Sequence, residues 1–481
     1  MEHVRCAICF LDRNKMETHS QPSYKLTSYP IGSIAELWTI SWPLMIGLLS
    51  SSIMMFVDRL ILARYSALAL NAAATAGMAF WAFAIVPLVC AGISEVFVGR
   101  NHGAGRMQEV GRPVWQMVWM SCGTLPLFLL CGWLAPQFIF SGTGNEILET
   151  AYFRSFMLFG PFFCSTVALI GFFVGIGQVR IVTASAIVGN IVNIGLDLLL
   201  VFGYGSIPAL GAHGAAVATG LSQIVQTVFL LMFFLRKKYR LDYRTADYSF
   251  RWGYFKESLV MGGPVGIGKF LEMLAHFVFF RIAAQSGPEN LTIITVAQSF
   301  YLLLCFVIEG LSKGVSSLVA NLLGGKQFDA LYKVLRAGMI LQTIFFIILA
   351  MLMILFSSPI LLLFFSGAGA QFLTDPTFVA TALSSLHWMC LFFLLDGFGW
   401  VYMGFLTAAG DTKFILYAGI VLNLFGYIVP TYFVLGVARA LADKGWMLIT
   451  VYAFVTFLTY AWRYRSKRWL KVFRETTAAA Q

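Results

Sequence analysis

Acidic side chains inside long apolar runs are the residues of this sequence best suited to chemistry. Asp58 stands in SSIMMFVDRLILA and Asp197 in NIVNIGLDLLLVF. A charge at the centre of a bilayer costs about 2.5 to 3.5 kcal/mol, so such acids usually mark an ion pathway or a pair. Asn190, Asn193 and Asp197 follow each other at i, i+3 and i+7, which places them on one helix face. Carboxylate and amide oxygens suit Na⁺, and paired carboxylates in a poorly solvated site can instead hold a proton, so both ions remain open.

A second set of charges lies in apolar runs of the second half of the chain. It comprises Lys269, Glu272, Glu309, Lys313 and Asp396. Lysine and glutamate are three residues apart in the first pair and four apart in the second. Each pair therefore lies on one helix face, where the lysine can neutralise the acid. Two interpretations of the set remain open, a coupling network for transport and a structural lattice of buried salt bridges.

The composition places all these residues in a membrane. Hydrophobic residues make up 59% of the chain and charged residues 11%, and the mean hydropathy is +0.80, far outside the range of soluble domains. Apolar runs of about 20 residues or more predict twelve membrane-spanning helices. They begin near Ile34, Leu68, Val114, Ala151, Ile181, Ala212, Ser258, Thr292, Val334, Phe378, Phe414 and Trp446. At about 1.5 Å per residue, two acids of each half are predicted at similar depths in the outer half of the membrane. These acids are Asp58, Asp197, Glu272 and Asp396.

The two halves of the chain repeat each other. Residues 171–203 align without a gap on residues 404–436, and in a second match Pro43 recurs as Pro264. Duplicated halves are a recurrent transporter design. We therefore predict an all-α integral membrane fold of twelve transmembrane helices in two six-helix lobes related by internal duplication, with helix kinks at both prolines. The predicted segments are a polar tail at 1–33, an N-lobe at 34–235, an inter-lobe loop at 236–257, a C-lobe at 258–463 and a basic tail at 464–481.

The net charge of +11 reflects the orientation of the loops. Lys and Arg gather in every second loop, above all at 236–256, and in the tail at 463–474. This positive-inside pattern predicts a multi-pass protein of the plasma membrane, or of the bacterial inner membrane, with both termini in the cytoplasm. Two of the basic links begin at Gly103 and Gly324 with GAGR and GGK, which predict tight turns. No nucleic acid is expected as a partner, because the basic residues form no recognition motif.

With these motifs in place, the sequence from about residue 35 to residue 462 resembles the multidrug and toxic compound extrusion (MATE) transporters. The matching motifs are FVDRLIL at 56–62, GAGR at 103–106, GNIVNIGLD at 189–197, GAAVAT at 214–219, GGP at 262–264, LVANLLGG at 318–325 and LTAAGDTK at 406–413. The resemblance implies antiport, in which Na⁺ or H⁺ entry drives the export of organic, often cationic and amphipathic compounds. It also implies that the two lobes rock around a central cavity.

The resemblance further assigns site residues. It implies a cation site in the N-lobe at Asp58, Asn193 and Asp197, completed by Thr219, and some members of the family use the equivalents of Glu272 and Asp396. The sequence departs from the family at Lys269 and Lys313, and at Thr407-Ala408, where many members have Arg-Gly.

The interpretation that follows is a secondary transporter with small organic substrates, membrane lipid as its environment and no cofactor beyond the coupling ion. The oligomeric state is not predicted, and a monomer is compatible with the pattern. Two alternative functions remain open, a lipid-linked oligosaccharide flippase of the same superfamily and a non-transporting membrane sensor. An enzyme is not expected, because the sequence has no HExxH motif and no arrangement of a nucleophile with its base.

Overall fold

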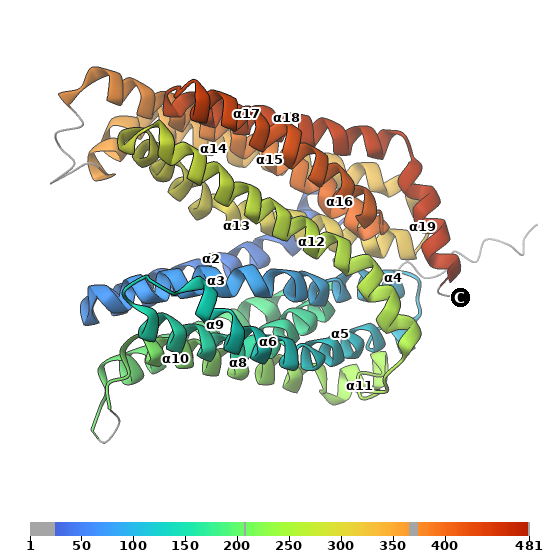
Figure 1. Ribbon diagram of the computed structural model, residues 1–481. Coiled ribbons are helices and arrows are strands. Elements are labelled where there is room, and N and C mark those ends of the chain that lie inside the picture. Colours follow the sequence, from blue (N-terminus) through green and yellow to red (C-terminus); the bar gives the residue numbers. More distant parts are fainter. Residues whose placement is uncertain (1–24, 206–207, 365–373, 480–481) are drawn as a thin grey trace, which may run out of the picture.

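Two layers of long helices make up the protein in a computed structural model, which describes residues 25–205, 208–364 and 374–479 (Figure 1). Most of the predicted N-terminal tail, residues 1–24, lies outside the described residues. Eleven helical segments of the described ranges are long and apolar enough to cross a membrane. The twelfth, α12, has 32 residues and contains the embedded charges Lys269 and Glu272. The prediction of twelve membrane-spanning helices in two lobes is confirmed.

The N-lobe contains the first six spans. Its helices are α2 (Ile34–Tyr65), α3 (Ala67–Gly92), α4 (Ser94–Gly103), α5 (Arg112–Gly123), α6 (Leu125–Leu134), α7 (Pro136–Ile139), α8 (Glu146–Gly175), α9 (Val179–Phe202) and α10 (Gly211–Phe234). The second span combines α3 and α4, and the third combines α5, α6 and α7. Pro43 lies inside α2, which continues through it as a single helix.

The C-lobe repeats this plan. Its helices are α12 (Trp252–Ala283), α13 (Pro288–Gly324), α14 (Leu331–Phe364), α15 (Pro376–Ala409), α16 (Thr412–Val421), α17 (Val429–Thr431) and α18 (Ala442–Arg465). Two π-helical stretches, Leu422–Ile428 and Tyr432–Val437, join α16 and α17 into the eleventh span. Pro264 lies inside α12, again without ending the helix. A final helix, α19 (Arg468–Ala479), forms most of the predicted C-terminal tail and runs across one end of the bundle (Figure 1).

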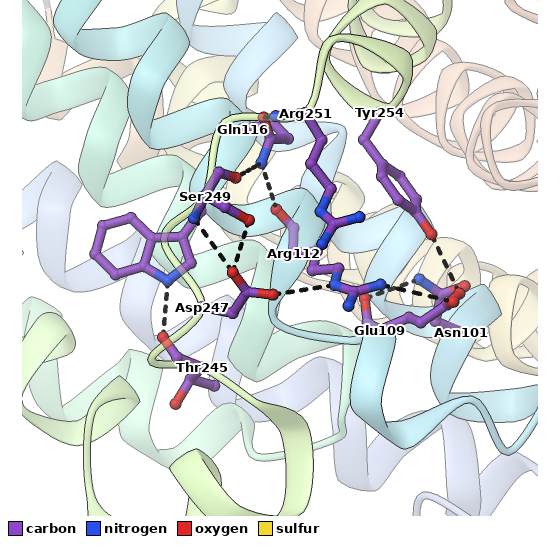
Figure 2. A network of polar contacts seen from close by, with 10 residues as sticks. Asn101, Glu109, Arg112, Gln116, Thr245, Asp247, Ser249, Arg251 and Tyr254 are labelled. Atoms are coloured by element: carbon purple, nitrogen blue, oxygen red, sulfur yellow. Dashed lines mark hydrogen bonds and ion pairs between the residues drawn. The ribbon is translucent and has the colours of Figure 1, made fainter.

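The predicted inter-lobe loop is largely ordered against the N-lobe. It contains a short helix, α11 (Lys237–Tyr243), and α12 begins at Trp252, within the predicted loop and six residues before the predicted start of the C-lobe. Figure 2 shows how the rest of the loop binds α5: Gln116 Nε2 donates to the carbonyl of Ser249 at 3.0 Å, and Arg112 Nε lies 3.3 Å from Asp247 Oδ2. The Ser249 hydroxyl and the Arg112 guanidinium lower the pKa of Asp247.

The lobes meet at the end of the bundle where α4 and α19 lie, and they diverge toward the opposite end (Figure 1). Two glycines allow the contact. A Cβ added at Gly103 would lie 1.9 Å from the carbonyl oxygen of Asn321, and one added at Gly324 would lie 2.0 Å from that of Arg100. The last residue of α4 thus touches the backbone of α13, and the last residue of α13 touches that of α4.

Polar bonds fasten the same contact. Arg100 of α4 donates from Nε and Nη2 to the carbonyl of Ala408 in α15, at 3.0 and 2.7 Å. His102 Nδ1 lies 2.8 Å from Asn321 Oδ1, and Asn321 Nδ2 donates to the carbonyl of Gly175 in α8 at 2.9 Å. The structure is therefore closed between the lobes at the end that the positive-inside rule assigns to the cytoplasm.

Candidate functional site

Asp58 and Asp197 come together in the N-lobe, from α2 and α9. Their carboxyl groups lie within electrostatic reach of each other. Asp197 is fully buried, and among the described residues no hydrogen-bond donor reaches either of its oxygens or Oδ1 of Asp58. Two adjacent carboxylates in a poorly solvated place repel each other unless a proton or a cation neutralises one charge. A proton or a cation bound at the pair would remove this repulsion.

Amide and hydroxyl groups extend this carboxyl pair along α9. Asn193, one turn before Asp197 and fully buried, donates from Nδ2 to the hydroxyl oxygen of Thr219 in α10 at 3.2 Å. Its carbonyl oxygen Oδ1 is buried and receives no hydrogen bond from the described part of the chain. Asn190 donates from Nδ2 to Ser50 Oγ of α2 at 2.5 Å, so it fastens α9 to the helix that carries Asp58. The predicted N-lobe residues all lie at this junction of α2, α9 and α10.

A tyrosine that the sequence did not single out borders the pair. Tyr152 of α8 is buried, stacks on Phe156 with ring centroids 4.8 Å apart, and lies within electrostatic reach of both Asp58 and Asp197. Its hydroxyl gives the site a polar group next to the carboxyls. No pattern of spacing or charge distinguishes Tyr152 from the many aromatic residues of the spans.

The C-lobe charges divide into two ion pairs and one acid bound by a tyrosine. Lys269 Nζ lies 2.7 Å from Glu272 Oε2 and 3.7 Å from the centroid of the Trp400 ring, which adds a cation–π contact. Lys313 Nζ lies 3.0 Å from Glu309 Oε1. No lysine of the described ranges forms an ion pair with Asp396; instead the Tyr301 hydroxyl donates to its Oδ2 at 2.7 Å.

These contacts distinguish the two lobes. In the part of the chain that the structure describes, the N-lobe pair of carboxyls has no ion-paired cationic side chain, whereas Glu272 and Glu309 of the C-lobe each have a lysine. A site that must take up and release a cation needs an uncompensated negative charge. On this geometry, the N-lobe pair is the stronger candidate for ion binding. The ion pairs of the C-lobe are better suited to a structural role.

Comparison with known proteins finds a family model and relatives that cover most of the chain. The family model MatE matches residues 43–199 and 264–432, one segment in each lobe. A probable multidrug resistance protein NorM of Photorhabdus laumondii is 23% identical over 82% of this chain and 85% of its own length. The multidrug resistance protein PmpM of Pseudomonas aeruginosa is 26% identical over 82% of this chain and 81% of its own.

Solved structures share the fold at low identity. A crystal structure described as MATE in the straight conformation has a TM-score of 0.81 at 19% identity, over 94% of this chain and 99% of that one. The outward-facing conformation of a multidrug resistance MATE family transporter has a TM-score of 0.76 at 19% identity, over 94% and 99%.

Proposed function

Because the chain belongs to the MatE family of membrane transporters, we propose that it is a secondary antiporter that exports small organic compounds in exchange for an inward-moving cation. It is a multi-pass membrane protein and a transporter, not an enzyme. The names of its relatives NorM and PmpM as multidrug resistance proteins support efflux of several compounds. For the substrates we propose organic, cationic or amphipathic molecules, since the lobes carry more embedded acids than embedded lysines.

The proposed coupling between cation entry and substrate export rests on the facing carboxyls of Asp58 and Asp197. A cation that enters the pair removes the repulsion between the two carboxylates, and its departure restores it. The occupied and empty states of the N-lobe therefore differ in electrostatic energy, which can bias the lobes between two arrangements. One charge that crosses 100 mV releases about 2.3 kcal/mol, enough for a roughly fiftyfold gradient of a neutral substrate.

We propose H⁺ as the coupling ion. Two facing carboxyl groups can share one proton, which forms a hydrogen bond between them and needs no further ligand. Na⁺ is the competing ion, and the buried Oδ1 of Asn193 is the oxygen that would favour it, because amide carbonyls suit hard cations.

Transport by purified protein in proteoliposomes tests the proposal. Ethidium efflux is followed under an imposed H⁺ gradient or an imposed Na⁺ gradient, for the wild type, Asp58→Asn and Asp197→Asn. We expect the H⁺ gradient alone to drive efflux and each substitution to abolish it. Asp329→Asn, which changes an exposed acid of the link before α14, is the matched control and is expected to transport as the wild type.

Three outcomes contradict parts of the proposal. Efflux driven by the Na⁺ gradient alone would contradict H⁺ as the coupling ion but not the N-lobe site. Efflux that survives both substitutions would move coupling to the C-lobe charges. No efflux of any organic cation under either gradient would contradict the antiport itself and favour a flippase or a sensor.

A further inference from the structure

Lys313 of α13 lies between two acids that belong to different lobes. Its Nζ is 3.0 Å from Glu309 Oε1 on the same helix, and the two side chains are 39% and 36% exposed. Glu95, in the first turn of α4 in the N-lobe, lies within electrostatic reach of the same ammonium group. The two helices pack in register: a Cβ added at Gly99 would lie 3.5 Å from the carbonyl oxygen of Ser317, and Glu95 and Lys313 each lie one turn before those residues. Glu95 therefore faces the C-lobe.

Glu95 is buried at the interface between the lobes, and one of its carboxylate oxygens lacks a hydrogen bond within the described ranges. Only 8% of Glu95 is exposed, and its Oε1 is buried with no hydrogen-bond donor from any residue that the structure describes. Helix α4 packs closely between α8 and α13. A Cβ added at Gly171 of α8 would lie 2.7 Å from the Glu95 amide nitrogen, and one added at Gly99 of α4 would lie 2.9 Å from Ala320 Cβ of α13. A buried carboxylate oxygen that lacks a donor is costly, so the nearby ammonium of Lys313 matters for the energy of Glu95.

We propose that Glu95 is a positioning residue for transport, whose attraction to Lys313 stabilises the arrangement in which the lobes are closed between α4 and α13. The two acids that share Lys313 differ in one respect. Glu309 and Lys313 are on one helix, so their attraction is present whether the lobes are together or apart. Glu95 and Lys313 are on different lobes, so their attraction is present only when the lobes are closed. Only an interaction that differs between two states can shift their populations. The inference rests on the proposed function, because it assumes that the lobes alternate between two arrangements.

Because Lys313 is shared by two acids, substitutions around it are expected to shift the balance between closed and separated lobes in opposite directions. Lys313→Met leaves Glu95 buried without an opposite charge in the closed arrangement, so it favours separation of the lobes. Glu309→Gln leaves Lys313 to Glu95 alone, so it favours closure. Glu95→Gln removes the charge that needs Lys313, so the double variant Glu95→Gln/Lys313→Met returns toward the wild type.

A native cysteine reports lobe separation at this contact. Cys90 of α3 is 5% exposed, and a Cβ added at Gly262 of α12 in the other lobe would lie 3.3 Å from its Sγ. In full-length protein with every other cysteine replaced by serine, the labelling rate of Cys90 by a small maleimide measures how often α3 and α12 separate. The measurement uses protein in lipid nanodiscs without any gradient or substrate.

We expect Lys313→Met to raise the labelling rate roughly tenfold or more, Glu309→Gln to lower it, and the double variant to restore it. Lys333→Met, in the first turn of α14, is the control for loss of a lysine and is expected to label as the wild type. Unfolding is distinguished by a second protein that retains only Cys390, which is buried in α15 and is expected to stay unlabelled in every variant. Labelling of Cys90 that is unchanged by Lys313→Met, or not restored by Glu95→Gln, overturns the inference. Because labelling needs no transport, this failure is separate from a failure of ion-driven efflux in proteoliposomes.

Discussion

Gly103→Ala tests whether the contact between α4 and α13 is the closure that transport requires. The new Cβ would lie 1.9 Å from the carbonyl oxygen of Asn321, whereas real Cβ atoms keep at least 3.0 Å from such atoms. The lobes must therefore separate at this point by about 3.0 − 1.9 = 1.1 Å, or the backbone must distort. The atom in the way belongs to a helix backbone, so no side-chain rotation relieves the clash.

The size of the effect follows from the packing. Forcing one methyl group into a filled contact costs about 1 to 3 kcal/mol, and a gap of about 1 Å forfeits a quarter to a half of the dispersion energy along it. The closed arrangement should lose that energy relative to the open one, which shifts the balance between them by roughly 5- to 150-fold. The bond between His102 and Asn321 weakens for the same reason, since both residues flank the clash.

Two assays measure the result. The Cys90 labelling rate should rise, and efflux from proteoliposomes should fall, because each transport cycle passes through the closed arrangement. Gly195→Ala in α9 is the matched control: an added Cβ meets nothing within 4 Å, so only the helix propensity changes. If Gly103→Ala labels and transports as Gly195→Ala does, the lobes do not need this contact and the reasoning is refuted.

Three further substitutions test the sites in each lobe and the inter-lobe loop. Thr219→Val removes the hydroxyl that accepts a hydrogen bond from the Asn193 amide in the N-lobe site, a bond worth about 1 kcal/mol. It should therefore raise the cation concentration for half-maximal efflux roughly fivefold, whereas the control Thr227→Val on the same helix should leave that concentration unchanged. Lys269→Met should lower the thermal unfolding midpoint, since it strands a carboxylate, and Lys269→Met/Glu272→Met should recover most of the loss; an equally unstable double variant would contradict a coupled pair. The lowered pKa of Asp247 predicts a stabilising contribution that is complete above the unfolded-state pKa of about 4 and is lost as pH falls below it, so the unfolding midpoints of wild type and Asp247→Asn should differ at pH 7 and converge toward pH 3.

The architecture could be predicted because it depends on properties that are local in the sequence. Apolar runs of sufficient length and the two internal matches predicted all twelve spans and their division into lobes, since a helix in lipid must satisfy its own backbone. The glycines at 103 and 324 were identified only as turn signals. Their closest contacts are with the opposite lobe, and a single sequence does not show which backbone a glycine allows to approach.

The contacts of the candidate site could be predicted only in part. Depth arithmetic placed Asp58 and Asp197 at similar heights, but height does not determine the rotation of two helices about their axes, which decides whether the side chains meet. Tyr152 and Tyr301 were missed because a tyrosine in an aromatic-rich membrane chain carries no signal of its own. Glu95 stands in an apolar stretch like Asp58 does, and the same rule about embedded acids applies to it.

If the proposed function holds, the difference between the lobes explains how a duplicated protein binds its coupling ion in one half only. An empty carboxyl pair such as Asp58 and Asp197 changes its net charge when a cation binds, and its energy changes accordingly. A lysine–glutamate pair is already neutral, so a cation that approaches it must compete with a bonded ammonium group. Substitutions that placed lysines next to the C-lobe acids would therefore weaken ion binding there while they preserve packing. The charge that Lys313 brings to the interface between the lobes then becomes available for a different task, which is to distinguish the closed arrangement from the open one.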